Sequence, residues 1–143
     1  MTSIGDVRQG IADAASVASY NGTQLSVSPN ITDPITAPCA RVYRKSFDPR
    51  LVLSQAKASR KFGLVLYAGR MSDRAAEALL DAYCDLSGTS SVLAAIQDGT
   101  NWTITVDYAS VTNIGPPTPM TVGVSKETAV DYLTVEFDIE VVW

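Results

Sequence analysis

Serine and cysteine side chains are the candidate nucleophiles of this chain, and neither type has a histidine to activate it. The 143 residues contain no histidine, and such nucleophiles usually need an adjacent base. Cys39 and Cys84 each stand apart from other thiols, so we expect two reduced, partly buried cysteines rather than a disulfide or a metal site. The glycine-rich motifs that bind nucleotides are also missing from the sequence. We therefore expect no enzymatic activity and no cofactor.

A row of acidic side chains recurs every four residues in the middle of the chain. Single helices seldom bring enough oxygen ligands to one hard cation. We therefore expect this row to be a solvated or partner-facing helix surface rather than a metal site. Residues 87–91, rich in serine, are a weak candidate for a phosphate cradle and are better explained as a helix cap. The row consists of Asp73, Glu77, Asp81 and Asp85.

Charge is divided unevenly along the chain. Residues 41–70 contain eight basic side chains and one acidic side chain, whereas residues 71–143 contain eleven acidic and two basic ones. Complementary charged surfaces set the register between protein partners, and a closed ring of identical subunits joins two different surfaces of each copy. Two solvated surfaces, or pairing of the segments within one subunit, are the alternatives. The predicted basic subunit interface consists of Arg41, Arg44, Lys45, Arg50, Lys57, Arg60 and Lys61.

Nucleic-acid binding is another use that the basic segment could serve, because Tyr43, Phe47 and Phe62 are interleaved with it. The chain as a whole is acidic, with an isoelectric point near 4.6, whereas phosphate binding needs positive potential at the contact. Acidic side chains suit the wall of a DNA conduit instead, because they repel phosphates. The candidates for an acidic interface or lumen are Glu136, Asp138 and Glu140.

Three helices are expected from apolar residues spaced three or four apart. The first spans residues 3–19, where Ser3 and Asp6 form a capping-box pattern. The second runs from the N-cap Ser72 to residue 87. The third begins after Ser90 or Ser91 and stops at Gly99.

Strands are expected where apolar and polar residues alternate or where β-forming residues cluster. The clearest is the last, residues 133–143, whose apolar side chains point one way and whose polar ones point the other. Further strands are predicted at residues 24–28, 39–47, 51–53, 62–68 and 102–113. This order of elements predicts an α+β fold with two layers, an antiparallel-dominated or mixed sheet and helices on one face.

Two proline-spaced segments separate these elements. Residues 29–38 and 115–126 are expected to be long loops, because proline excludes regular helix. Rigid loops lose little entropy on docking, so we expect them to contact partners, with passive connections as the alternative. The prolines concerned are Pro29, Pro34, Pro38, Pro116, Pro117 and Pro119.

The length of the chain favours one domain over residues 1–143, since domains typically have roughly 100–200 residues. Its start is not that of a secretory signal, and no stretch approaches the roughly 20 apolar residues that span a bilayer. We therefore expect no membrane association and assembly in a cytoplasm.

Small, apolar and charged residues form a pattern between residues 70 and 95. It comprises residues 70–76, 81–83, 86–88, 91–92 and 94–95, with weaker support from residues 6–14 and 133–137. In this pattern the chain resembles the tail terminator proteins of long-tailed, siphovirus-like bacteriophages. The segment 29–38 and the basic stretch after Asp48 depart from what that family would lead us to expect.

The resemblance implies a structural virion protein of the head–tail junction. Such proteins form a ring, usually of six subunits, which caps the tail tube, stops its polymerisation and meets the head-side connector or stopper. DNA would pass through the lumen without specific binding. Another neck component (a stopper, adaptor or completion protein), a tube subunit, or, in a different class, a small ligand-binding domain are the alternatives.

Overall fold

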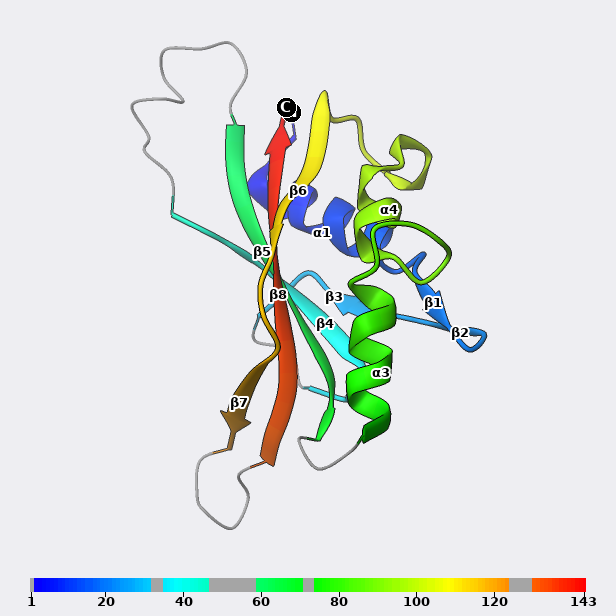
Figure 1. Cartoon of the computed structure of the whole chain (residues 1–143). Helices are drawn as coiled ribbons and strands as arrows, with labels where there is room; N and C mark the ends of the chain where they lie inside the picture. Colours follow the sequence, from blue (N-terminus) through cyan, green and yellow to red (C-terminus); the bar gives the residue numbers. More distant parts are fainter. Residues whose placement is uncertain (1, 32–34, 47–58, 71–73, 124–129) are drawn as a thin grey trace.

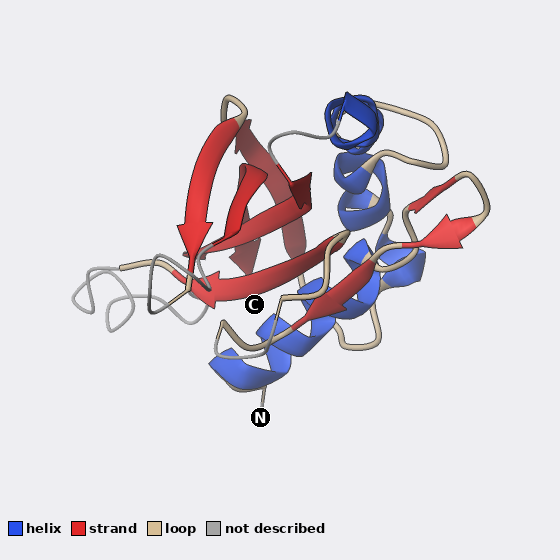
Figure 2. Ribbon diagram, turned by 90° about the horizontal axis from the view of Figure 1, so that it is seen from below, coloured by secondary structure: helices blue, strands red, loops and turns tan. Residues whose placement is uncertain are grey.

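The computed structural model describes residues 2–31, 35–46, 59–70, 74–123 and 130–143. Within these ranges, helices lie against one face of a six-stranded sheet, and Figures 1 and 2 show the two layers. The α-helices are α1 (Ile4–Ala15), α3 (Arg74–Tyr83) and α4 (Val92–Gln97), and a 3-10 turn, η1 (Gly99–Asn101), follows α4.

The sheet has the order β3-β4-β5-β8-β6, and β7 pairs with β8 beside β6. Every pair is antiparallel except β3 with β4, which is parallel. The predicted α+β class with a mixed, mostly antiparallel sheet is therefore confirmed. The strands are β3 (Ser26–Ser28), β4 (Cys39–Arg44), β5 (Ser59–Arg70), β6 (Tyr108–Ile114), β7 (Thr118–Val122) and β8 (Val130–Val142).

The first helix begins where the capping box predicts. The Ser3 hydroxyl accepts from the Asp6 backbone N–H at 3.1 Å, and the Asp6 carboxylate accepts from the Ser3 N–H at 2.9 Å. The helix ends at Ala15, four residues earlier than expected, because the chain turns into a short hairpin of β1 (Ser19–Tyr20) and β2 (Thr23–Gln24). Positive φ angles at Asn21 and Gly22 suit the tight turn of this hairpin.

The two later helices lie near their predicted positions. Ser91 is the N-cap of α4, and its hydroxyl accepts from the Ala94 N–H at 3.0 Å. The helix α3 ends at Tyr83 rather than near residue 87, and residues 71–73 of its predicted start lie outside the described residues. The predicted strand at residues 51–53 lies outside them as well.

The predicted strand over residues 102–113 is wrong in its first half, because pairing begins only at Tyr108. The Trp102 indole donates to the Ile96 carbonyl at 2.7 Å. A β-carbon added at Gly10 of α1 would lie 3.0 Å from the Trp102 ring and 3.1 Å from Ile104. The apolar side chains of this segment therefore pack over helices, which produces the same alternation as a half-buried strand.

The predicted loop over residues 115–126 also needs correction, because its centre is the strand β7. Pro119 lies opposite Leu133 of β8. A proline can occupy this position because β7 pairs with one described strand only, and an edge strand tolerates a missing donor.

The core lies between the sheet and the helices. Along β8, alternate side chains point into it, as the sequence predicts: Val135, Phe137, Ile139 and Val141 are buried. The intervening side chains Glu136, Asp138 and Glu140 lie on the opposite, open face, which no helix of the described ranges covers (Figure 2). The part of this face around Glu136, Asp138 and Glu140 is therefore polar, whereas Cys39, Val65 and Tyr67 form a buried apolar cluster elsewhere on it.

Candidate functional site: the open face of the sheet

A polar cluster occupies the middle of the open face. The Tyr43 side chain on β4 reaches across β5 to β8, where its hydroxyl donates to the Glu136 carboxylate. Its ring lies over Gly63, which pairs with Tyr43 in register. A β-carbon on Gly63 would lie only 2.4 Å from the Tyr43 ring. The glycine therefore makes room for the tyrosine to bridge three strands.

Lys45 adds a positive charge to the same cluster. Its ammonium group donates to Asp138 and lies 3.7 Å from Glu136 Oε2. Both carboxylates project from β8, two residues apart and thus on one face. Lys45 and Asp138, which are 93 residues apart in sequence, are therefore paired within one subunit.

The surroundings of Glu136 favour its protonated form more than the surroundings of an exposed glutamate do. Burial, followed by the charge of Asp138, raises the pKa of Glu136. Lys45 lies 3.7 Å from Glu136 and makes its closer contact with Asp138. The cluster contains one lysine for two carboxylates.

The described members of the predicted basic interface do not form one surface. Arg60 and Lys61 are consecutive on β5 and point to opposite faces of the sheet. The Arg60 guanidinium lies 4.6 Å from the centre of the Trp143 ring, whereas Lys61 is exposed and pairs in register with Glu140. Arg44 lies opposite the buried Phe62, on the helix side of β4. Arg50 and Lys57 lie outside the described residues.

Arg41 belongs to a second contact on the open face. Its guanidinium lies 5.0 Å from the centre of the Tyr67 ring and donates to the Tyr67 hydroxyl at 2.5 Å and to the Ile31 carbonyl. Tyr67 is buried with Cys39 and Val65 in a small apolar cluster of this face. This arginine therefore stabilises the fold locally.

The predicted acidic row along β8 is present, but it is not a uniformly negative wall. Glu136 and Asp138 are engaged by Tyr43 and Lys45, and Glu140 accepts from the Ser59 hydroxyl at 2.6 Å. Ion pairing within one subunit, one of the alternatives for the uneven charge along the chain, thus accounts for part of that charge. Phe62, an aromatic of the nucleic-acid alternative, is fully buried in the core and cannot stack on a base; Phe47 lies outside the described residues.

The prolines of the predicted partner loops have different surroundings. The Pro29 carbonyl accepts from Arg8 at 3.3 Å, and Pro38 precedes β4 and lines a cavity. Pro116 and Pro117 are exposed between β6 and β7, and Pro119 is part of β7. Pro34 lies outside the described residues.

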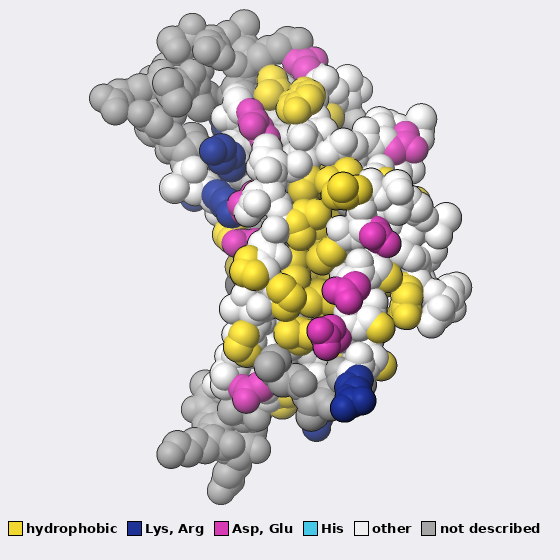
Figure 3. All heavy atoms as spheres, viewed as in Figure 1, with side chains coloured by type: hydrophobic (Ala, Val, Ile, Leu, Met, Phe, Trp, Pro, Cys, Tyr) yellow, Lys and Arg dark blue, Asp and Glu magenta, His cyan; other side chains and the backbone are white. Residues whose placement is uncertain are grey.

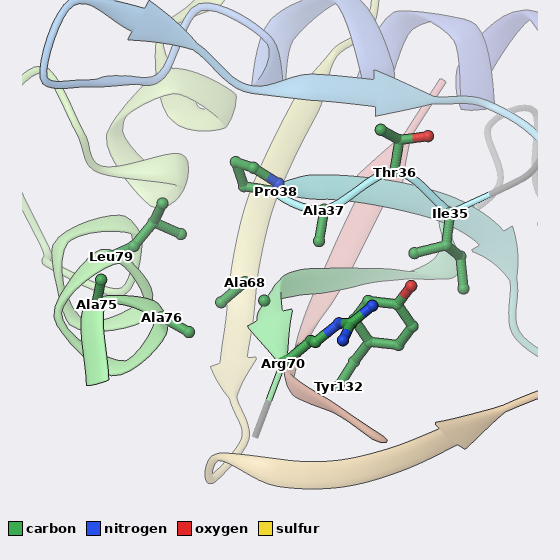
Figure 4. Close-up of a pocket in the computed structure, with 11 residues that line it drawn as sticks. Ile35, Thr36, Ala37, Pro38, Ala68, Arg70, Ala75, Ala76, Leu79 and Tyr132 are labelled. Atoms are coloured by element: carbon green, nitrogen blue, oxygen red, sulfur yellow. The ribbon is translucent and has the colours of Figure 1, made fainter. Parts of the chain in front are cut away.

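The cavity of about 520 Å³ that Pro38 lines was not predicted. Figure 4 shows Ala75, Ala76 and Leu79 of α3 on one side and residues 35–38 on the other. Arg70 and Tyr132, from the ends of β5 and β8, complete its wall. The only sequence signal for it is the concentration of small residues around Gly69 and Ala76, and that signal does not show which segments meet.

The two cysteines and the predicted acidic row have different exposures. Cys39 is buried, Cys84 is half-buried, and both are free thiols. Glu77, Asp81 and Asp85 are exposed, while Asp73 lies outside the described residues. Within the described ranges, no group of acidic or cysteine side chains could hold a metal ion. No helix in these ranges is long and apolar enough to cross a membrane.

No protein-family model and no curated protein sequence matches this chain. The fold and the open face therefore define only a class, an α+β protein with one helix-covered and one polar sheet face.

Proposed function

We propose that this chain is a structural subunit of the tail terminator type, located in the virion at the head–tail junction. The observation that carries the proposal is the unequal pair of sheet faces. Helices cover one face, and the other presents ion-paired polar side chains around Glu136 and Asp138. A subunit that lines a conduit needs a rigid wall with a polar surface, and paired charges supply it without attracting DNA phosphates.

The free sheet edge supports assembly into a ring. The strands β6 and β7 pair with β8 on one side, and no described strand pairs with their other side. Unpaired N–H and C=O groups at an edge are a template for another chain. In this proposal six copies close into a ring that caps the tube protein, stops its polymerisation and contacts the connector or stopper.

The resemblance over residues 70–95 selects this function among assembly proteins. On the described open face the carboxylates of Glu136 and Asp138 are engaged by Tyr43 and Lys45 rather than by a nucleophile. Action by shape and charge therefore explains the surface more simply than turnover does. The protein would be assembled in the host cytoplasm and remain in the particle.

The test combines the purified chain with the tail tube protein encoded nearest to its gene. Electron microscopy should show rings at tube ends, and tube growth should stop when the chain is added. Tubes that elongate normally and carry none of this protein at their ends would refute the proposal. Bovine serum albumin at the same concentration is the control for non-specific inhibition.

A further inference from the structure

The most exposed large apolar side chain of the described residues is Leu86, which follows α3. It is 72% exposed. The preceding residue, Asp85, is exposed, and its carbonyl accepts from the buried Ser91 hydroxyl at 2.5 Å. This bond fixes the loop that carries Leu86, so little entropy would be lost when the leucine docks.

The cavity at the other end of α3 is complementary to such a side chain. Its walls include Ala76, Leu79 and Ala68, and its volume of about 520 Å³ lies within the range of roughly 300–1,000 Å³ typical of ligand pockets. A β-carbon on Gly69 would lie 3.1 Å from the Ala76 side chain. The absence of a side chain at Gly69 therefore lets α3 pack closely against β5 in the wall of the cavity.

Basic side chains flank the N-terminal end of α3, where Glu77 is also present in the first turn, and only acidic ones lie near its C-terminal end. Arg70 lines the cavity and Arg74 begins the helix, whereas Asp81 and Asp85 lie near its C-terminal end. Figure 3 shows acidic side chains along α3 and basic ones beside its lower end, which is its N-terminal end in Figure 1. A leucine flanked by an aspartate thus matches an apolar cavity with an arginine in its wall.

The leucine cannot reach the cavity of its own molecule. Leu86 is 72% exposed and does not line the cavity of its own molecule, and the cavity residue nearest to it in sequence, Leu79, lies roughly 10 Å away along the helix axis. The occupant must come from another molecule. A contact between two different surfaces of identical chains is heterologous and closes into a ring when the rotation between copies permits.

We infer that Leu86 of one copy inserts into the cavity between α3 and residues 35–38 of a second copy, with Asp85 facing Arg70. This inference rests on the proposed function, because it names a contact of the proposed ring. It also commits to a second copy of this chain as the occupant, rather than a small molecule or a foreign peptide.

The first test compares two substitutions of exposed apolar residues. Leu86→Ser should raise the dissociation constant for self-association about tenfold or more, the factor expected for loss of a buried leucine. Val17→Ser, at a position 45% exposed just after α1, is the matched control and should leave the constant unchanged. Sedimentation velocity over a concentration series measures both, and circular dichroism confirms folding.

The second test reverses the charges on either side of the contact. Asp85→Arg and Arg70→Asp should each weaken self-association. An equimolar mixture of the two variants should restore it, because each copy then meets a neighbour of opposite charge on both sides. A wild-type chain that stays monomeric would overturn the inference, as would a mixture that associates no better than either variant alone.

The two proposals can fail separately. If wild-type protein caps tubes but Leu86→Ser associates as well as Val17→Ser does, the contact is wrong and the function stands. If the charge-reversed mixture assembles but neither it nor the wild-type protein stops tube growth, the contact stands and the terminator function is wrong.

Discussion

Gly63 offers a sharp test of how the open face is built. A β-carbon at this position would lie 2.4, 2.5 and 2.7 Å from Cε1, Cζ and Oη of Tyr43. Real β-carbons do not approach so closely, so the substitution Gly63→Ala must displace the ring and break its hydrogen bond to Glu136. Overpacking of this kind costs about 1–3 kcal/mol, and we expect Gly63→Ala to lower the free energy of unfolding by that amount.

The effect of Gly63→Ala on the free energy of unfolding should change sign when the Tyr43 ring is removed. In a Tyr43→Val background nothing blocks the new methyl group, and a Gly-to-Ala change then stabilises by about 0.4–1 kcal/mol through the unfolded chain. The coupling free energy between the two positions should therefore exceed about 1 kcal/mol. Urea unfolding of the wild type, the two single variants and the double variant measures it.

A matched control is available at Gly99, where an added β-carbon would meet no atom within 4 Å. We expect Gly99→Ala to change the free energy of unfolding by less than about 0.5 kcal/mol. The reasoning is refuted if Gly63→Ala behaves like Gly99→Ala, or if its cost is the same with and without the Tyr43 ring.

Three further predictions concern single groups. Ser3→Ala should lower the free energy of unfolding by about 1 kcal/mol, the usual cost of a lost N-cap. A change in melting temperature equal to that of Ser16→Ala would contradict this prediction. Burial and a neighbouring carboxylate raise the pKa of Glu136, so its protonated form is favoured in the folded state. Stability should therefore fall as the pH rises from the ordinary glutamate pKa through the raised one, and urea titrations should show that this slope disappears in Glu136→Gln. Burial and two nearby aspartates raise the pKa of Cys84 to about 11, so iodoacetamide should label it at pH 8 far more slowly than a free thiol. Asp81→Asn should speed that labelling, and a rate unaffected by pH between 8 and 10 would contradict the assignment.

Periodicity alone predicted the layers of this fold. The alternation along β8 was sufficient because a thirteen-residue strand with one buried face leaves a long pattern. The same signal misled at Trp102 and Ile104, where apolar side chains pack on α1 instead of pairing in a sheet. An alternating pattern reports burial, and it does not say which element does the burying.

The candidate site was less accessible to sequence reasoning. The basic residues were found as a group, but β5 begins at Ser59, before the predicted strand at residues 62–68, and its alternation places Arg60 and Lys61 on opposite faces. The ion pairs of Lys45 with Glu136 and Asp138 join the residue after β4 to a strand far downstream in the sequence. Such partners depend on register, which local composition does not determine. The cavity beside α3 is formed by three separate segments and has no local signature.

The position of β8 in the sheet has a consequence for how the protein is made. This strand lies between β5 and the pair β6 and β7, yet it is the last of them to be synthesised. Until β8 emerges from the ribosome, one side of β5 has no partner strand. The register runs from Ser59 opposite Val142 to Arg70 opposite Tyr132, so the partner residues lie about 70 positions downstream. Closure over such sequence separations is slow. A nascent chain stalled before β8 would therefore expose bare strand edges to aggregation and depend on chaperones.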